Sequence, residues 1–116
     1  MMEISRQMID GVLVLRLDFE RLDTKMAPDL KAEFLQALGE NYINILVNFE
    51  KVKYADSSGL GALLLGTRQT REHGGQFKIC CSNGRILQLI EIAKLEKHII
   101  NYESEKEALK SFSESN

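Results

Sequence analysis

The sequence predicts an α/β domain in which about four helices pack on a mixed, mainly parallel sheet that begins with a β-hairpin. Two observations lead to this fold class. Near the N-terminus, two apolar segments flank Asp10-Gly11, a pair that favours a hairpin turn because both positions readily adopt positive φ. After the second apolar segment, strand patterns and helix patterns alternate along the chain. Short connections between alternating elements favour parallel strands joined by right-handed crossovers.

The composition is that of a single globular domain over residues 1–116. Hydrophobic residues make up 44% of the chain and charged residues 28%, which is enough apolar material for one core. The net charge of -2 argues against nucleic-acid binding, which needs a basic surface. No segment approaches the ~20 apolar residues of a membrane span, and residues 1–6 lack the apolar core of a signal peptide. We therefore expect a cytosolic protein that contacts neither nucleic acid nor membrane.

The first half of the chain shows three strand patterns and one helix pattern. The strands are expected over residues 3–9, 12–17 and 43–49. The helix contains Pro28 in its first turn, where the missing N–H costs nothing, and ends near Gly39. Residues 18–25 are polar and irregular apart from Phe19 and Leu22. No strand is expected in that segment.

A second helix is expected directly after the central strand. Its apolar stripe should face the core and consists of Leu60, Leu63, Leu64 and Thr67. Ala62 and Gly66 are small and should permit close packing against the sheet, and Gly74-Gly75 ends the helix. Arg68, Arg71 and Glu72 lie off the stripe and form an exposed face.

The C-terminal part continues the alternation. Its elements are a strand over residues 76–82, a helix, a strand over 98–102 and a last helix. Ser82 or Asn83 can cap the first of these helices, and Ser104 and Glu107 are spaced as a capping box for the second. A polar tail is expected from about residue 113.

Cys80 and Cys81 are adjacent in the third of the parallel strands expected. Successive side chains of a strand point to opposite faces, so we expect no disulfide between them. Both are interpreted as small apolar residues of a buried strand in a reducing compartment.

The most informative segment lies where the central strand pattern changes to the second helix pattern. It consists of Asp56, Ser57, Ser58, Gly59, Leu60 and Gly61. A helix N-terminus presents unpaired N–H groups and a partial positive charge. Ser57 or Ser58 can cap the helix, and the two glycines allow a sharp turn. A serine at such a position can also belong to an anion site or accept a phosphate, and the local residues leave these alternatives open.

Common catalytic and cofactor-binding patterns are missing around this segment. Ala55 replaces the first glycine of a nucleophile elbow around Ser57. His73 and His98 occur at the edges of different elements, and no spacing pairs either with Ser57. The sequence has no phosphate loop, dinucleotide fingerprint or metal-ligand spacing. We therefore expect neither an enzyme nor a bound cofactor or metal.

The segment over residues 49–64 resembles the signature of STAS domains, and most closely that of bacterial anti-sigma factor antagonists. The match includes Asp56 at the end of the strand, the two serines and the Gly-Leu-Gly that follows. The N-terminal hairpin, Gly74-Gly75 and residues 95–97 agree with the family in the same order. The resemblance implies a STAS fold, and it implies that Ser57 is the phosphorylation site, with the rest of the Asp56 to Gly61 loop beside it in partner binding.

The family function implied by this resemblance is partner switching. The unphosphorylated protein would bind an anti-sigma factor serine kinase and release a sigma factor, and phosphorylation of Ser57 would end the binding until a cognate phosphatase acts. Family members typically carry Gly-Glu-Leu-Asp before the first helix as part of the kinase contact. Residues 20–23 keep only Leu22 and Asp23 of this pattern, so Asp23 is a further partner-binding candidate.

Two other functions are compatible with the sequence. Similar domains serve as non-switching scaffolds or regulatory subunits of transport or signalling complexes. A hydrolase that uses Ser57 would need an acid–base partner close in space. A homodimer is also compatible with the chain.

Overall fold

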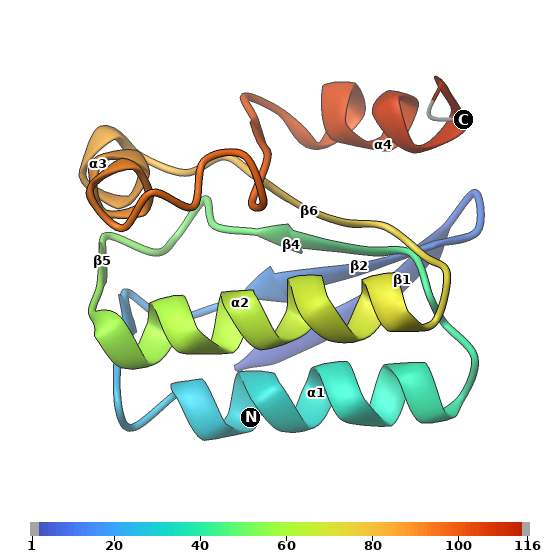
Figure 1. Ribbon diagram of the computed structural model, residues 1–116, viewed down its shortest axis with the longest axis horizontal. Helices are drawn as coiled ribbons and strands as arrows, with labels where there is room; N and C mark the ends of the chain where they lie inside the picture. Colours follow the sequence, from blue (N-terminus) through green and yellow to red (C-terminus); the bar gives the residue numbers. More distant parts are fainter. Residues whose placement is uncertain (1–2, 115–116) are drawn as a thin grey trace.

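Five strands form the central sheet of the computed structural model, which describes residues 3–114 (Figure 1). Across the sheet they are β1 (Ile4–Ile9), β2 (Val12–Leu17), β4 (Ile45–Asn48), β6 (Phe77–Cys80) and β7 (Asn101–Tyr102). β1 is antiparallel to β2, and every other neighbouring pair is parallel. The predicted mixed, mainly parallel sheet is confirmed.

The β1–β2 hairpin turns at the two predicted positions. Asp10 has a φ of 49° and Gly11 a φ of 81°, and Ile9 pairs with Val12 on either side of them. Positive φ at both positions matches the twist of the flanking strands. β2 is buried at every position except the half-buried Arg16, as its continuous apolar run predicts for a strand covered on both faces.

Within the described residues, four helices surround the sheet, as predicted. They are α1 (Ala27–Gly39), α2 (Ser57–Glu72), α3 (Gly84–Ile92) and α4 (Glu105–Glu114). Figure 1 shows α1 and α2 side by side on one face of the sheet and α4 on the opposite face. α3 lies beside the end at which the parallel strands finish. None of these helices is long and apolar enough to cross a membrane.

The main core fills the space between the sheet and helices α1 and α2. Phe34 of α1 meets Phe77 of β6 edge to face, with ring centroids 5.2 Å apart. Ala62 is fully buried, and a Cβ at Gly66 would lie 2.6 Å from the Phe77 ring. Small residues therefore allow α2 to approach the sheet, as predicted. A second apolar cluster, which includes Phe112 of α4, covers the other face.

Two short strands that were not predicted form a separate small sheet. β3 (Arg21–Leu22) and β5 (Tyr54–Ala55) pair in parallel, and the Asp56 N–H extends the pairing by donating to the Leu22 carbonyl at 3.2 Å. A strand of two residues shows no recognisable hydrophobic period. This small sheet places the chain before α1 alongside the chain before α2.

The last strand begins later than predicted. β7 starts at Asn101 rather than at residue 98, because the N–H groups of His98 and Ile99 both donate to the Leu95 carbonyl and form a turn. β4 is likewise shorter than the predicted 43–49.

The predicted caps of the last two helices are present. Asn83, rather than Ser82, caps α3 by accepting the Ile86 N–H at 2.9 Å. The Ser104 hydroxyl accepts the Glu107 N–H at 3.1 Å, which is one half of the predicted capping box. α4 continues to Glu114, so the start of the predicted polar tail is helical, and residues 115–116 lie outside the described part.

Both cysteines are free thiols, as predicted. Cys80 is buried at the end of β6, whereas Cys81 follows the strand with a φ of 63° and is half-buried. The expectation that both belong to a buried strand is therefore wrong for Cys81. Burial raises the pKa of each thiol, which keeps both protonated at neutral pH.

Candidate functional site

Asp56 caps helix α2. It has extended backbone (φ -114°, ψ -169°), and its carboxylate accepts the N–H of Ser58 at 2.9 Å and of Gly59 at 3.1 Å. The prediction that Ser57 or Ser58 caps the helix is wrong. The helix begins one residue earlier than a serine cap requires, and a carboxylate at this position is favoured by the partial positive charge of the helix N-terminus.

Ser57 is thereby left exposed at the first position of the helix. Among the described residues, none forms a hydrogen bond with its hydroxyl. Ser58, the next residue, is half-buried. Of the two serines, Ser57 is the more exposed.

The two glycines of the segment have different surroundings. Gly59 is buried against β3, and a Cβ there would lie 2.5 Å from the Leu22 carbonyl oxygen. Gly61 is exposed in α2, and a Cβ there would meet no atom within 4 Å. Neither has positive φ. Gly59 is required by close packing rather than by a turn, and the turn-forming role predicted for Gly61 is wrong.

The leucines of α2 follow the predicted stripe in part. Leu63 is buried in the main core. Leu60 packs against the same core but is half-buried, and Leu64 is half-buried as well. The start of α2 therefore offers some apolar surface beside Ser57.

The small β3–β5 sheet brings Asp23 next to this helix start. The Leu22 carbonyl accepts the Asp56 N–H, so Asp23 and Ser57 directly follow the two paired residues. The Asp23 carboxylate accepts the Lys25 N–H at 3.0 Å and lies 3.6 Å from Nε of Arg21. Desolvation alone would raise the pKa of Asp23, but the backbone N–H donors and Arg21 outweigh it and lower the pKa. Asp23 is therefore charged and already engaged in shaping the turn before α1.

Three further residues beside this segment were not predicted. The ring of Tyr54 lies 4.5 Å from the guanidinium carbon of Arg21 and 5.1 Å from that of Arg85. Arg85 belongs to α3 and lies 31 positions after Tyr54, so no spacing in the sequence could have revealed the contact.

Neither histidine is placed to act as the acid–base partner of Ser57 that a serine hydrolase would need. His73 follows the far end of α2, about 24 Å from Ser57 at 1.5 Å per residue, and its Nδ1 lies 2.8 Å from the Gln69 carbonyl oxygen. His98 belongs to the turn before β7. Neither forms a hydrogen bond with Ser57.

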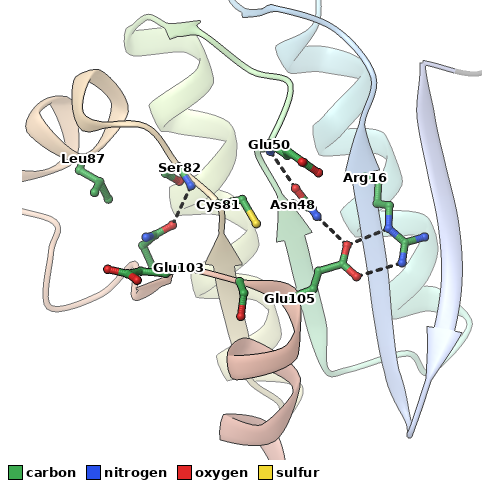
Figure 2. Close-up of a pocket in the computed structure, with 10 residues that line it drawn as sticks. Arg16, Asn48, Glu50, Cys81, Ser82, Leu87, Glu103 and Glu105 are labelled. Atoms are coloured by element: carbon green, nitrogen blue, oxygen red, sulfur yellow. Dashed lines mark hydrogen bonds and ion pairs between the residues drawn. The ribbon is translucent and has the colours of Figure 1, made fainter.

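A groove of about 780 Å³ opens between α3 and α4 at the end of the sheet (Figure 2). On its floor, Arg16 donates to the Glu105 carboxylate through two hydrogen bonds of 2.7 and 3.0 Å, and Asn48 donates at 2.6 Å. The Arg16 hydrogen bond is the largest cause of the lowered pKa of Glu105, and the same bond raises the pKa of Arg16. This network fixes the start of α4 to β2 and β4. Within residues 3–114, no group of three or more His, Cys, Asp or Glu is placed to hold a metal ion.

The family model for the STAS domain matches residues 3–108, which is most of the chain. The chain belongs to the STAS domain family. An anti-sigma F factor antagonist from Paenibacillus polymyxa is 27% identical over 109 residues, which are 93% of this chain and 92% of that protein. The resemblance inferred from residues 49–64 is confirmed.

Solved STAS structures show the same fold. An anti-sigma-factor antagonist domain protein from Planctomyces limnophilus superposes with a TM-score of 0.85 at 21% identity, over 95% of this chain and 97% of that one. The Bacillus cell fate determinant SpoIIAA in its phosphorylated form gives a TM-score of 0.73 at 23% identity, over 93% and 97% of the two chains. The predicted STAS-like fold is therefore confirmed.

Proposed function

We propose that this STAS protein is an anti-sigma factor antagonist that works by partner switching and is controlled by phosphorylation of Ser57. The observation that carries the proposal is the exposed Ser57 hydroxyl directly after the capping Asp56, in a chain similar over 93% of its length to an anti-sigma F factor antagonist. The proposed contact surface is the start of α2, from Asp56 to Gly61, together with Asp23. Its partner is a serine kinase that also holds a sigma factor, in the cytosol.

Phosphorylation should leave this domain folded. A phosphate adds about -1.5 to -2 charge at neutral pH. At a helix N-terminus such a charge is favourable by ~0.3–1 kcal/mol at an exposed site, and the adjacent Asp56 carboxylate opposes it only weakly.

The phosphate should mainly lower the stability of the complex with the partner. A dianion would meet a partner surface that is shaped for a neutral hydroxyl. If this charge mismatch costs about 3 kcal/mol of binding free energy, the affinity falls more than a hundredfold, since about 1.4 kcal/mol corresponds to a tenfold change in the dissociation constant. The kinase supplies its own ATP and magnesium, and a cognate phosphatase restores the binding form, so the chain itself needs no cofactor.

The test uses the purified protein with the serine-kinase anti-sigma factors of its own organism. After incubation with ATP, mass spectrometry should place one phosphate on Ser57 and none on Ser58. Ser57→Ala should bind the kinase but accept no phosphate, Ser57→Asp should bind at least about tenfold more weakly, and Ser58→Ala is the matched control that should behave as wild type. Absence of phosphate with every such kinase would favour the non-switching scaffold instead.

A further inference from the structure

Three side chains from three different elements form a cationic cluster beside the start of α2. Arg21 of β3 and Arg85 of α3 both lie against the ring of Tyr54 of β5, at 4.5 and 5.1 Å from the ring centroid. A guanidinium over an aromatic ring is attracted by the electrons of the ring face. The Tyr54 ring thus brings two positive charges from sequence-distant elements close together.

The two arginines are less engaged in ion pairs than the lysines around them. Lys51 pairs with Asp18 at 3.0 Å, and Lys53 pairs with Glu20 at 3.3 Å. Arg85 forms no ion pair with any described residue, and Arg21, whose side chain is 66% exposed, has only the 3.6 Å approach to Asp23. A guanidinium carries five N–H donors in a planar fork that suits carboxylates, and contact with a ring face leaves those donors available.

The cluster is continuous with the surface around Ser57. Tyr54 and Arg21 are paired across the small sheet, and the next bond of that ladder joins Leu22 to Asp56. Figure 1 shows β5 leading directly into α2, with α3 beside β5 at the same end of the molecule. A protein that covers the start of α2 would therefore also cover this cluster.

We propose that the cluster of Arg21, Tyr54 and Arg85 recognises an acidic segment of the partner kinase. This inference rests on the proposed function and adds the chemistry of the partner surface. Tyr and Arg are the residue types that most often dominate binding energy at interfaces, and arginines already positioned by a ring lose little freedom on binding. The same chemistry gives the phosphate on Ser57 a direct effect, because a dianion beside the cluster repels the carboxylates that the arginines attract.

The experiment measures binding of the same purified kinases by calorimetry at low and high salt. Charge reversal of both arginines, Arg21→Glu with Arg85→Glu, should weaken binding at least about tenfold and reduce its salt dependence. The matched control carries the same charge change on the exposed far half of α2, as Arg68→Glu with Arg71→Glu, and should bind within about threefold of wild type. Circular dichroism establishes that each variant is folded, and Arg21→Ala with Arg85→Ala provides a second, milder test.

The outcomes separate this inference from the proposed function. If wild type binds a kinase and neither double-arginine variant binds it more weakly, the proposed role of the cluster is wrong. Partner switching would be unaffected by this result. Failure of wild type to bind any of the kinases would overturn both. Rescue of the charge-reversed protein by a kinase in which acidic residues are replaced by lysine would establish direct pairing.

Discussion

Asp56 sets the conformation of the candidate site by capping α2 with two hydrogen bonds, to the N–H groups of Ser58 and Gly59. Because the carboxylate takes the capping role, the Ser57 hydroxyl has no structural task and remains exposed. The sequence placed a cap in this segment but not on this residue, since Asp, Ser and Asn cap about equally well and the deciding factor is the residue at which the helix begins.

We expect Asp56→Ala to lower the free energy of unfolding by about 1 kcal/mol, because both N–H groups lose their acceptor. Asp56→Asn should retain most of the stability, since its amide oxygen can accept the same N–H groups. Urea denaturation followed by circular dichroism measures both. Equal stability of wild type and Asp56→Ala would contradict the capping role.

Gly59 and Gly61 provide a matched pair in one helix turn. Gly59→Ala should lower the free energy of unfolding by about 1–3 kcal/mol, because the new methyl group would lie 2.5 Å from the Leu22 carbonyl oxygen. Gly61→Ala should raise it by up to about 1 kcal/mol, because the position is open and alanine favours helix. Thermal or urea unfolding distinguishes them, and the same sign for both changes would refute the close packing of α2 on β3.

Among the elements, α4 depends on polar contacts that no local pattern reveals. Its Glu105 carboxylate receives hydrogen bonds from Arg16 and Asn48, which precede it by 89 and 57 positions. The capping box at Ser104 could be predicted because it is local. The Glu105 network could not, because it depends on which strands become neighbours. β3 and β5 could not be predicted for the same reason, because their pairing depends on the tertiary fold and not on a periodic hydrophobic pattern.

Glu105→Gln should lower the free energy of unfolding at neutral pH by about 1.5–3 kcal/mol, since a charged acceptor of several hydrogen bonds is lost. The folded-state pKa of Glu105 lies below its unfolded value, so its stabilisation is complete above the unfolded pKa of about 4.3 and is lost as pH falls through the folded pKa. The difference between wild type and variant should therefore shrink at acid pH. Urea titrations across pH measure it, with Glu107→Gln as a control that removes a charge from the same helix turn without removing a hydrogen bond to Arg16 or Asn48.

At the scale of the whole molecule, the strand and helix order could be predicted almost completely. The hairpin, the central strand and all four helices have strong local signals, such as Asp10-Gly11 and the stripe that includes Leu63. The candidate site was predicted as the segment from Asp56 to Gly61 together with Asp23. Its neighbours Arg21 and Arg85 come from distant parts of the chain and meet at Tyr54 only in the folded protein.

Phosphorylation should alter the surface without altering the fold. Protein with phosphoserine incorporated at position 57 should unfold within about 4 °C of the unmodified protein, because a change of up to about 1 kcal/mol corresponds to a shift of this size in a domain of this length. Calorimetry of both forms measures the shift. A non-cooperative transition in the phosphorylated form would show that the modification acts through unfolding instead.

Neighbouring residues at β3 have opposite environments. Leu22 is fully buried against Gly59, whereas Glu20 and Arg21, which directly precede it, are exposed. Substitutions at the exposed positions can therefore change charge without disturbing the core. If the proposed partner surface includes these positions, related proteins with this fold could differ in partner choice through surface charge alone, while keeping the same core.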